Sequence, residues 1–309
     1  MNKYRQLLSA TTLLGIVGLS ATPLFAQLPE NLRDYPLAQQ RATGEAVAPM
    51  FNGWIRNEDG SVTMIFGFAN MNREQVIDVP IGPDNHIEPA QFDGMQPTHF
   101  PTYSRGGFVG RQERGVFAVT VPAEMKKTEV VWTLSYNGYS YSIPGRATSS
   151  AYEMSTAGGA YGSLNPAIRF SPNGPESTDR EGIYAPRVTA TVGKPVTLSA
   201  YAQDRGHRDG YDVKRLIFPV GTEWILHQGP AEPQLEQAKI TGRERTRLEV
   251  GEGTAANSTG WTEVSTLATF NVPGDYVIRL RVDNFEAPDS KFDNQCCWSN
   301  AYVPVTVTP

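Results

Sequence analysis

Only two of the 309 residues are cysteines, and they are neighbours, Cys296 and Cys297. Two thiols are too few for the disulfide framework that stabilises small secreted domains, so hydrophobic cores must hold this fold together. The chain also lacks the G-x-S-x-G, H-E-x-x-H, C-x-x-C and phosphate-binding glycine motifs. We therefore expect a protein that is not an enzyme, although a Ser-His-Asp site built from distant loops stays open because such triads are recognised by geometry.

An excess of positive charge is absent as well. Lysine and arginine number 27 against 32 acidic residues, and the formal net charge is −5. Without a basic patch the chain lacks the electrostatic footprint of a nucleic-acid-binding protein. Beyond the N-terminus no apolar run approaches the roughly 20 residues that a membrane-spanning helix needs.

The N-terminus has the layout of a signal peptide. Lys3 and Arg5 precede the apolar stretch 7–25, which is broken only by small or hydroxyl residues and by Pro23. We expect residues 1–26 to be the signal and cleavage to follow Ala26. The alternative is a retained membrane anchor. The sequence thus predicts export across the inner membrane to the periplasm, the outer surface or the medium.

The remaining composition favours an all-β protein, because 29 glycines and 23 prolines accompany many valines, threonines and tyrosines. We expect two β-sandwich domains of immunoglobulin-like type. The predicted parts are an N-terminal arm (27–48), a first sandwich (49–146), a linker rich in glycine, serine and proline (147–182) and a second sandwich (183–309). Within the linker only "AIRF" is suited to a short strand, with Ile168 and Phe170 as anchors.

Two hairpins mark the first sandwich. The turn "NEDG" separates two β-rich runs, and Val62, Met64, Phe66 and Phe68 alternate onto one face of the second run. Asn137-Gly138 suits a type I′ turn, since both residues reach positive φ easily. Trp132 lies on the strand before that turn and is expected to face the core.

Between the hairpins lies a stretch rich in glycine and proline, 79–115, which we expect to be mostly loop. Long ordered loops tend to carry function, and Pro97 and Pro101 would stiffen the segment around His99. His99 is therefore a candidate ligand contact. The alternative is that the loop covers one edge of the sandwich and that His99 bonds its own backbone.

The second sandwich shows regular alternation. In 276–282, Tyr276, Ile278, Leu280 and Val282 fall on one face, and Arg279, Arg281 and Asp283 fall on the other. Four stretches, "VGKPVTLSAYAQD", "EWILHQGP", "ATFNVPGDYVIRLRVDN" and "VPVTV", make residues 183–309 resemble the polycystic-kidney-disease-type (PKD) branch of immunoglobulin-like domains. The resemblance implies a tyrosine corner at Tyr276. It also implies a binding or spacing role rather than catalysis.

The whole chain is also similar to an uncharacterised family of exported bacterial proteins. These combine an N-terminal β block, with its "NGW", "FGF" and "PTHF" stretches, with a PKD-like block that carries "QCCW". The resemblance implies no particular activity.

One constellation in the second sandwich suggests a metal. In such a fold the loop after the second strand and the loop before the last strand lie at the same end. These loops carry Glu286 and six aspartates, and the six aspartates are the predicted Ca²⁺ ligands: Asp204, Asp209, Asp212, Asp283, Asp289 and Asp293. The alternative is a set of solvated turn residues, neutralised by Arg205, Arg208 and Lys291.

The adjacent cysteines lie in the second of these loops. Neighbouring Cα atoms are about 3.8 Å apart, less than the usual ~4.4–6.8 Å of a disulfide, so a Cys296–Cys297 bridge would close a strained ring. An oxidising compartment favours this vicinal disulfide. The alternatives are two thiols or an intermolecular bridge, and a soft metal held together with His207.

These observations predict an exported, non-catalytic binding, adhesion or structural protein of the bacterial cell envelope. Its partner would be an extracellular or periplasmic carbohydrate or protein. Tyr201 and Trp298 are the candidate exposed aromatic residues for stacking on it, with His99 as a further contact. The alternative is a periplasmic accessory protein or enzyme with metal or redox chemistry at the Cys296-Cys297 loop.

Overall fold

The computed structural model describes residues 41–102, 112–154, 164–206, 220–242, 244–245, 260–284 and 297–309. They belong to one compact unit, Arg41–Pro309. Within these ranges the regular structure is β, apart from helical residues at 242 and 244–245 and three single-turn 3₁₀ helices: η1 (Ala90–Phe92), η3 (Ala123–Met125) and η4 (Ser150–Tyr152). The prediction of an all-β fold is confirmed.

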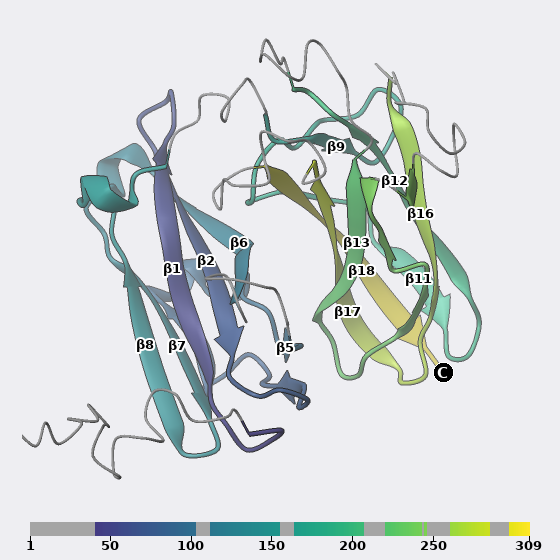
Figure 1. Ribbon diagram of the computed structural model, residues 1–309, viewed down its shortest axis with the longest axis horizontal. Helices are drawn as coiled ribbons and strands as arrows, with labels where there is room; N and C mark the ends of the chain where they lie inside the picture. Colours follow the sequence, from purple (N-terminus) through teal and green to yellow (C-terminus); the bar gives the residue numbers. More distant parts are fainter. Residues whose placement is uncertain are drawn as a thin grey trace, which may run out of the picture. The chain divides into compact units, whose positions relative to one another are not determined.

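The first sandwich consists of two three-stranded sheets and a short ribbon (Figure 1). One sheet has the order β1-β2-β6, with β1 (Val47–Arg56), β2 (Val62–Asn70) and β6 (Gln112–Val121). The other has the order β4-β7-β8, with β4 (Asn85–Glu88), β7 (Val130–Tyr136) and β8 (Tyr139–Gly145). The ribbon pairs β3 (Ile77–Asp78) with β5 (His99–Phe100). All pairings among these strands are antiparallel.

The core of the first sandwich is aromatic. Trp132 is fully buried, with its ring centroid 5.1 Å from that of Phe117 and 6.4 Å from that of Phe66. The predicted alternation of β2 is confirmed, since its four predicted inward residues all join this core. The predicted turn is confirmed too: Asn137 and Gly138 have φ of 50° and 80°.

The stretch 79–115 contains more regular structure than the prediction of a loop allowed. It holds β4, β5 and the start of β6. Asn85 organises the region: its side chain donates to the carbonyls of Val79 and Pro97 and accepts from the Trp132 indole N–H at 3.0 Å. A single buried amide thus replaces the long ladders that this proline-rich sequence cannot form.

The second sandwich has one larger and one smaller sheet (Figure 1). The larger has the order β10-β18-β17-β13-β15, and β11 also pairs with β18. Its strands are β10 (Ile183–Tyr184), β11 (Val188–Thr191), β13 (Gly221–Gln228), β15 (Lys239–Ile240), β17 (Gly274–Asp283) and β18 (Trp298–Thr308). The smaller has the order β14-β16-β12-β9, with β14 (Gln234–Glu236), β16 (Thr262–Thr269), β12 (Val196–Gln203) and β9 (Ala167–Arg169).

The predicted tyrosine corner is present. The Tyr276 hydroxyl donates to the carbonyl of Val272 at 2.7 Å, and its ring is buried against Phe270. Tyr276, Ile278 and Leu280 lie in the core between the two sheets, as the alternation of β17 predicts.

The predicted linker contributes to the second sandwich. Within 147–182, β9 pairs with the edge of β12, Ile168 is fully buried, and Phe170 packs against the same core. Both predicted anchors are therefore placed as expected. The boundaries 49–146, 147–182 and 183–309 stay a prediction.

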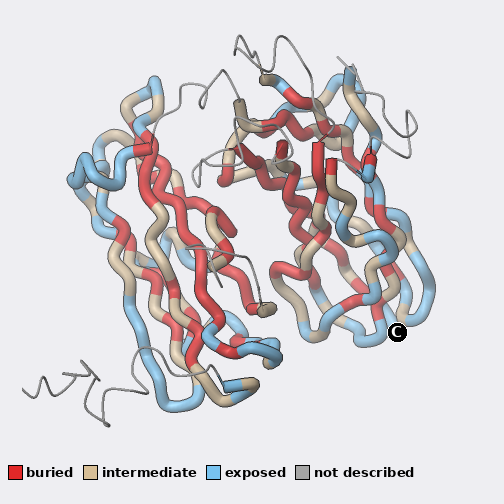
Figure 2. The backbone as a smooth tube through the Cα atoms, in the orientation of Figure 1, coloured by how far each residue is buried: buried red, intermediate tan, exposed pale blue. Residues whose placement is uncertain are grey.

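Three strands, β2, β17 and β18, are more completely buried than the strands of an isolated sandwich. Strand β2 is buried at every position, and β17 is buried without interruption from Ile278 to Val282 (Figure 2). Strand β18 is buried from Trp298 to Val303 in the same way. Alternating strands bury one face in their own core, so another part of the chain must cover the second face of these strands.

Candidate functional site

The second face of β17 and β18 is covered by β6 of the first sandwich. The β6 ladder is interrupted there: Phe117 pairs with Phe66 and Glu113 with Phe68, so residues 114–116 stand opposite Gly67 alone. This "β6 bulge" (residues 114–116) frees backbone carbonyls from the ladder, as bulges do. Gly115 makes it possible with a φ of 56°.

Side chains of β17 and β18 bind the freed carbonyls. The Gly115 carbonyl accepts from the Asn300 side-chain amide at 2.8 Å and from the Trp298 indole N–H at 3.4 Å. The Val116 carbonyl accepts from the Arg279 guanidinium and from the Tyr302 hydroxyl, both at 3.1 Å. The Gly115 and Val116 carbonyls of the bulge therefore gain partners from the second sandwich.

A buried ion cluster adjoins the bulge. The Glu113 carboxylate accepts from Arg279 and Arg281, both at 2.8 Å, and Arg281 also pairs with Glu223. Glu113 has no exposed surface, and the side chains of Arg279 and Arg281 are 1% and 4% exposed. We call these four residues the Glu113 cluster. Buried charges of this kind are tolerated only when they are paired.

A second contact joins loop 94–98 to β13. The Thr98 backbone N–H donates to the His227 carbonyl at 2.8 Å, and the Gln228 amide donates to the carbonyls of Gly94 and Gln96, both at 2.8 Å. The His227 ring nitrogen Nε2 lies 2.8 Å from the Met95 carbonyl. The loop therefore covers β13 of the second sandwich, which agrees with the alternative of a loop that covers an edge.

Burial controls the titration of the groups at this contact. Desolvation and the Arg279 charge lower the pKa of His227 to about 3, against a small opposing effect of the bond to Met95. Its ring is therefore neutral at physiological pH and donates from Nε2. Desolvation raises the pKa of Tyr302, and desolvation together with the Glu181 charge raises that of Tyr184 to about 12.

His99 is not the exposed ligand contact that the sequence suggested. Its side chain is only 4% exposed, and Nδ1 lies 2.7 Å from a carboxylate oxygen of Asp78. The two residues are directly opposite each other in the β3-β5 ribbon, which brings their side chains together. The alternative of a bond to its own backbone is also wrong, because the partner is the Asp78 carboxylate.

Trp298 is not exposed either. It is 5% exposed, with the Arg180 guanidinium 4.3 Å from its ring and the β6 bulge beneath it. The prediction of an exposed stacking residue is wrong because the face of β18 that carries Trp298 is covered by the first sandwich.

Tyr201 lies where the alternation of β12 predicts, half-buried on the face away from the core. Its neighbours across the strands are Glu263 and Arg169. The Arg169 guanidinium stacks 3.7 Å from the ring centroid of Trp261. Tyr201 stays a candidate binding residue, and the sequence reading missed the two residues of this stacked pair beside it.

The two loops proposed as a metal site do meet at one end of the second sandwich. The Asp204 carboxylate accepts from the Asn284 amide at 3.3 Å, and the Asn284 backbone N–H donates to the Cys297 carbonyl at 3.2 Å. Asp283 ends β17 directly opposite Trp298. The expected convergence of the loops is thus confirmed for these residues.

The metal itself stays a prediction. Asp209, Asp212, Asp289 and Asp293 lie outside the described residues, as does His207. Across the described ranges no group of three or more histidine, cysteine, aspartate or glutamate side chains is arranged to hold a metal ion.

Cys297 is fully buried at the same end of the sandwich and takes part in a disulfide bond. The other cysteine of the chain, Cys296, lies outside the described residues. The vicinal pairing of the two stays a prediction.

The sequence reading missed Glu113, Arg279 and Arg281 as contact residues. It placed both arginines on the face of β17 away from the core, which is correct, but that face is buried. The available signal was the pair of arginines at alternate positions of β17, together with the "ERG" near the start of β6. Alternation alone does not distinguish a solvated polar face from a covered one.

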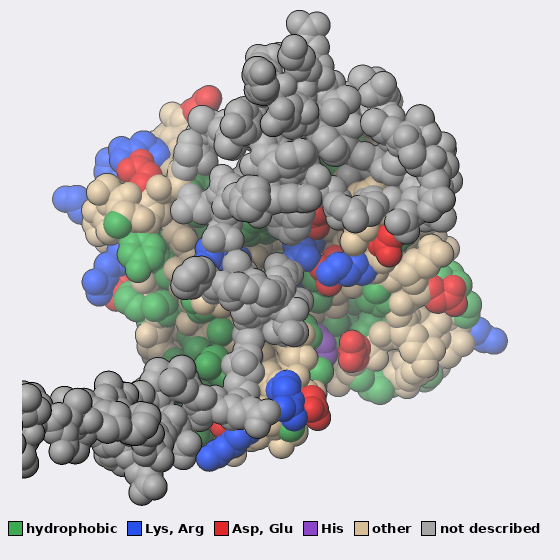
Figure 3. Space-filling view, viewed as in Figure 1, with side chains coloured by type: hydrophobic (Ala, Val, Ile, Leu, Met, Phe, Trp, Pro, Cys, Tyr) green, Lys and Arg blue, Asp and Glu red, His purple; other side chains and the backbone are tan. Residues whose placement is uncertain are grey.

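On the face shown in Figure 3, the visible charges of the described residues are not segregated by sign. In Figure 3 the visible basic and acidic side chains alternate over the face and do not form a field of one sign. No helix in the part of the chain that the structure describes is long and apolar enough to cross a bilayer.

No protein-family model matches the chain, and no curated protein sequence matches it. Among solved structures, a nucleoside hydrolase-related hypothetical protein from Saccharophagus degradans is similar at 10% identity and a TM-score of 0.24, over 47% of this chain and 26% of its own. The D00-D0 domain of intimin is similar at 11% identity and a TM-score of 0.25, over 84% of this chain and 100% of its own. Domains 4 and 5 of the S-layer protein SbsC are similar at 11% identity and a TM-score of 0.22, over 86% of this chain and 98% of their own. At these TM-scores the fold assignment rests on the strands themselves.

Proposed function

We propose that this chain is an exported, non-catalytic binding or structural protein of the bacterial cell envelope, in which two β-sandwiches act as one stiff unit. The observation that supports this most is the contact of the β6 bulge with β17 and β18. It places Glu113 and Arg279 out of solvent and satisfies two bulge carbonyls from the other sandwich. Sandwiches joined in this way present their outer faces and loops at constant spacing.

The stiffness follows from the cost of separation. Pulling the sandwiches apart would leave the Val116 and Gly115 carbonyls without the side chains that now bind them and would expose Trp298 and Tyr302. Domains in one chain usually move relative to each other unless their contact is large and apolar. Here the buried aromatic rings and the paired charges of the Glu113 cluster hold the two sandwiches together.

We propose export because residues 1–26 have the layout of a signal peptide. The proposed location in the cell envelope depends on that export. The tyrosine corner and the antiparallel pairing of β12 with β16 and of β13 with β17 support an immunoglobulin-like sandwich for residues 183–309. That this sandwich is of PKD type is part of the proposal. The partner would be a carbohydrate or a protein, and Tyr201 with Trp261 and Arg169 provides an aromatic and cationic surface on the outer face of β12.

Two measurements test the proposal. N-terminal sequencing of the protein from its producing cell should start at Gln27. The mature protein should sediment with purified cell envelopes, equally with and without EDTA, and Tyr201→Ala should reduce the bound fraction without changing the melting temperature. A mature protein that sediments with no envelope fraction would contradict the binding role and leave only the structural one.

The alternative, redox or metal chemistry at the Cys296-Cys297 loop, requires a sulfur that solvent can reach. Cys297 is buried and bonded, so only Cys296 remains for that chemistry. We propose that the two are joined to each other, since the chain has no third cysteine. Intact-mass analysis after alkylation without reductant should then show no added label. A doubly labelled protein would remove the ring and favour the alternative.

A further inference from the structure

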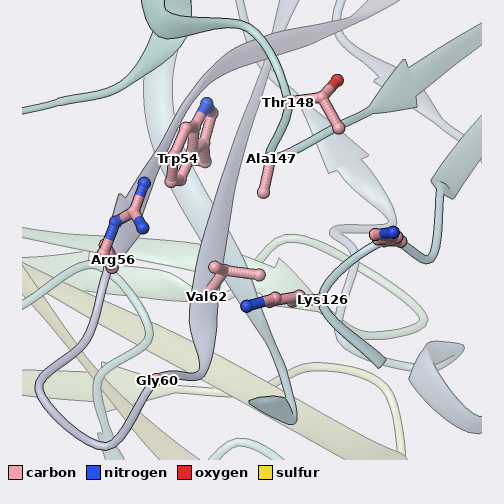
Figure 4. A pocket seen from close by; sticks show the side chains of 8 residues that line it. Trp54, Arg56, Gly60, Val62, Lys126, Ala147 and Thr148 are labelled. Atoms are coloured by element: carbon pink, nitrogen blue, oxygen red, sulfur yellow. The ribbon is translucent and has the colours of Figure 1, made fainter. Parts of the chain in front are cut away.

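A small hollow lies at one end of the first sandwich. It has a volume of about 240 Å³ and opens between the ends of β1 and β2 and the segments that follow η3 and β8 (Figure 4). Trp54, Val62 and Ala147 form apolar parts of its wall. The Trp54 indole is fixed by a hydrogen bond of 3.0 Å to the Ser149 carbonyl. The wall is therefore preformed by packed residues.

The charged residues at the hollow are all basic. Arg56, Lys126 and Lys127 line it, and none of the lining residues is acidic. Arg56 is held in place, since its guanidinium lies 5.5 Å from the Trp54 ring centroid and 3.4 Å from the Glu153 carboxylate. In Figure 4 the amine of Lys126 points toward Val62, at the side of the hollow.

The two lysines differ from Arg56 in having no counterion. Both are exposed, and no ion pair or hydrogen bond joins either side chain to another described residue. The nearby Glu129 is engaged with Arg146. Two ammonium groups beside an apolar wall form a site for an anion, because the low-dielectric wall weakens the screening of their charge.

The size of the hollow limits the ligand. A water molecule occupies about 30 Å³ of liquid, so the hollow has room for a molecule of several heavy atoms but not for a drug-sized one, which needs roughly 300–1,000 Å³. A single sugar ring or a phosphate group fits this range.

We propose that this hollow binds a small anion that carries a carboxylate or a phosphate group, as an acidic sugar does, with the anionic group at Lys126 and Lys127 and the rest against Val62 and Ala147. This site lies in the first sandwich and is separate from the Tyr201 surface proposed above. Because both lysines are exposed, the affinity is modest, and the binding weakens as salt is added.

The test is a calorimetric titration of the mature chain with D-glucuronate, inorganic phosphate and D-glucose. Binding of either anion, and not of glucose, is expected, and the anion that binds identifies the carboxylate or the phosphate as the recognised group. The Lys126→Gln/Lys127→Gln variant should weaken binding by at least about twofold, since it removes two exposed charge contacts.

Two further variants make the result specific to the hollow. Arg73→Gln/Lys194→Gln removes the same formal charge from exposed positions elsewhere and should leave the affinity unchanged. Ala147→Leu fills the hollow without changing its charge and should abolish binding, with the melting temperature as the check on folding. Equal loss in both double variants, or no binding of either anion, overturns the proposal. Sedimentation with cell envelopes tests the envelope-binding role without using these anions. Failure of the anion-binding proposal can therefore be distinguished from failure of the envelope-binding proposal.

Discussion

At the scale of single residues, Gly115 combines two constraints. Its φ of 56° is a conformation that residues with a Cβ rarely adopt, and a Cβ built there would lie 2.6 Å from the Trp298 ring. Its carbonyl accepts from Asn300. The residue thus sets both the shape of the β6 bulge and the approach of β18.

Replacement of Gly115 by alanine should lower the free energy of unfolding by about 2–4 kcal/mol. Backbone strain contributes about 1–3 kcal/mol, and the contact with Trp298 adds overpacking of similar size. Urea denaturation measures the loss. Gly138→Ala is the matched control, since Gly138 has φ of 80° but no atom within 4 Å of a built Cβ. Equal losses in the two variants would show that the Trp298 contact contributes nothing.

His227 makes stability depend on pH. Its folded pKa of about 3 is below the unfolded value of about 6.5. Between these values the unfolded chain binds a proton that the folded chain does not, so stability is present above pH 6.5 and falls as the pH is lowered toward 3. From pH 6.5 to 5 the loss from this residue should be about 2 kcal/mol.

The measurement is the free energy of unfolding at a series of pH values for the wild type and for His227→Gln. The variant should be less stable at pH 7, because it alters the contact with Met95, but its stability should depend less on pH between 6.5 and 4. Parallel pH profiles for the two proteins would contradict the assignment.

Several residues could be placed from the sequence because their roles are local. The Tyr276 corner, the Asn137-Gly138 turn and the inward residues of β2 depend on spacing within a few positions. His99 and Trp298 could not be placed, because what buries them lies far away in the chain. Trp298 bonds the carbonyl of a residue 183 positions earlier, and no local pattern carries that information.

At the scale of elements, β17 shows what an alternating pattern leaves open. Ile278 and Leu280 enter the core between the sheets, and Arg279 and Arg281 point the other way, as predicted. The pattern assigns side chains to faces, but it does not say what meets the polar face. Here another sandwich meets it, through a carboxylate placed at the edge of a bulge.

The Glu113 cluster should be much more sensitive to substitution than a surface ion pair. Glu113→Gln leaves two buried guanidinium groups without this carboxylate, and loss of one partner of a buried pair typically costs about 3–5 kcal/mol. Glu129→Gln is the control, because its pair with Arg146 is exposed and should contribute far less to stability. Chemical denaturation of both variants compares the two. A similarly small decrease in the free energy of unfolding for both variants would mean that water reaches the Glu113 cluster.

At the scale of the whole molecule, the contact between the sandwiches predicts cooperative unfolding. Differential scanning calorimetry of the mature chain should show a single transition with equal calorimetric and van't Hoff enthalpies. Glu113→Gln should divide that transition into two or lower its cooperativity, because the sandwiches then separate before either unfolds. Two well-separated transitions in the wild type would mean that the sandwiches are independent.

The predicted fold class and the meeting of the two loops at one end of the second sandwich were accessible from the sequence because sandwich topology is regular. The association of the sandwiches was not. It depends on a three-residue interruption in β6 that falls within a stretch whose glycines and prolines indicate a loop.

The β6 bulge also bears on how the newly made chain matures. The Val116 carbonyl waits for the hydroxyl of Tyr302, 186 residues later, and at about 5–20 residues per second a ribosome needs roughly 10–40 s to supply it. During that interval the β6 bulge of the first sandwich is uncovered, and only water can donate hydrogen bonds to its carbonyls. The Val116 carbonyl gains its protein partners from β17 and β18 only when these last strands are added.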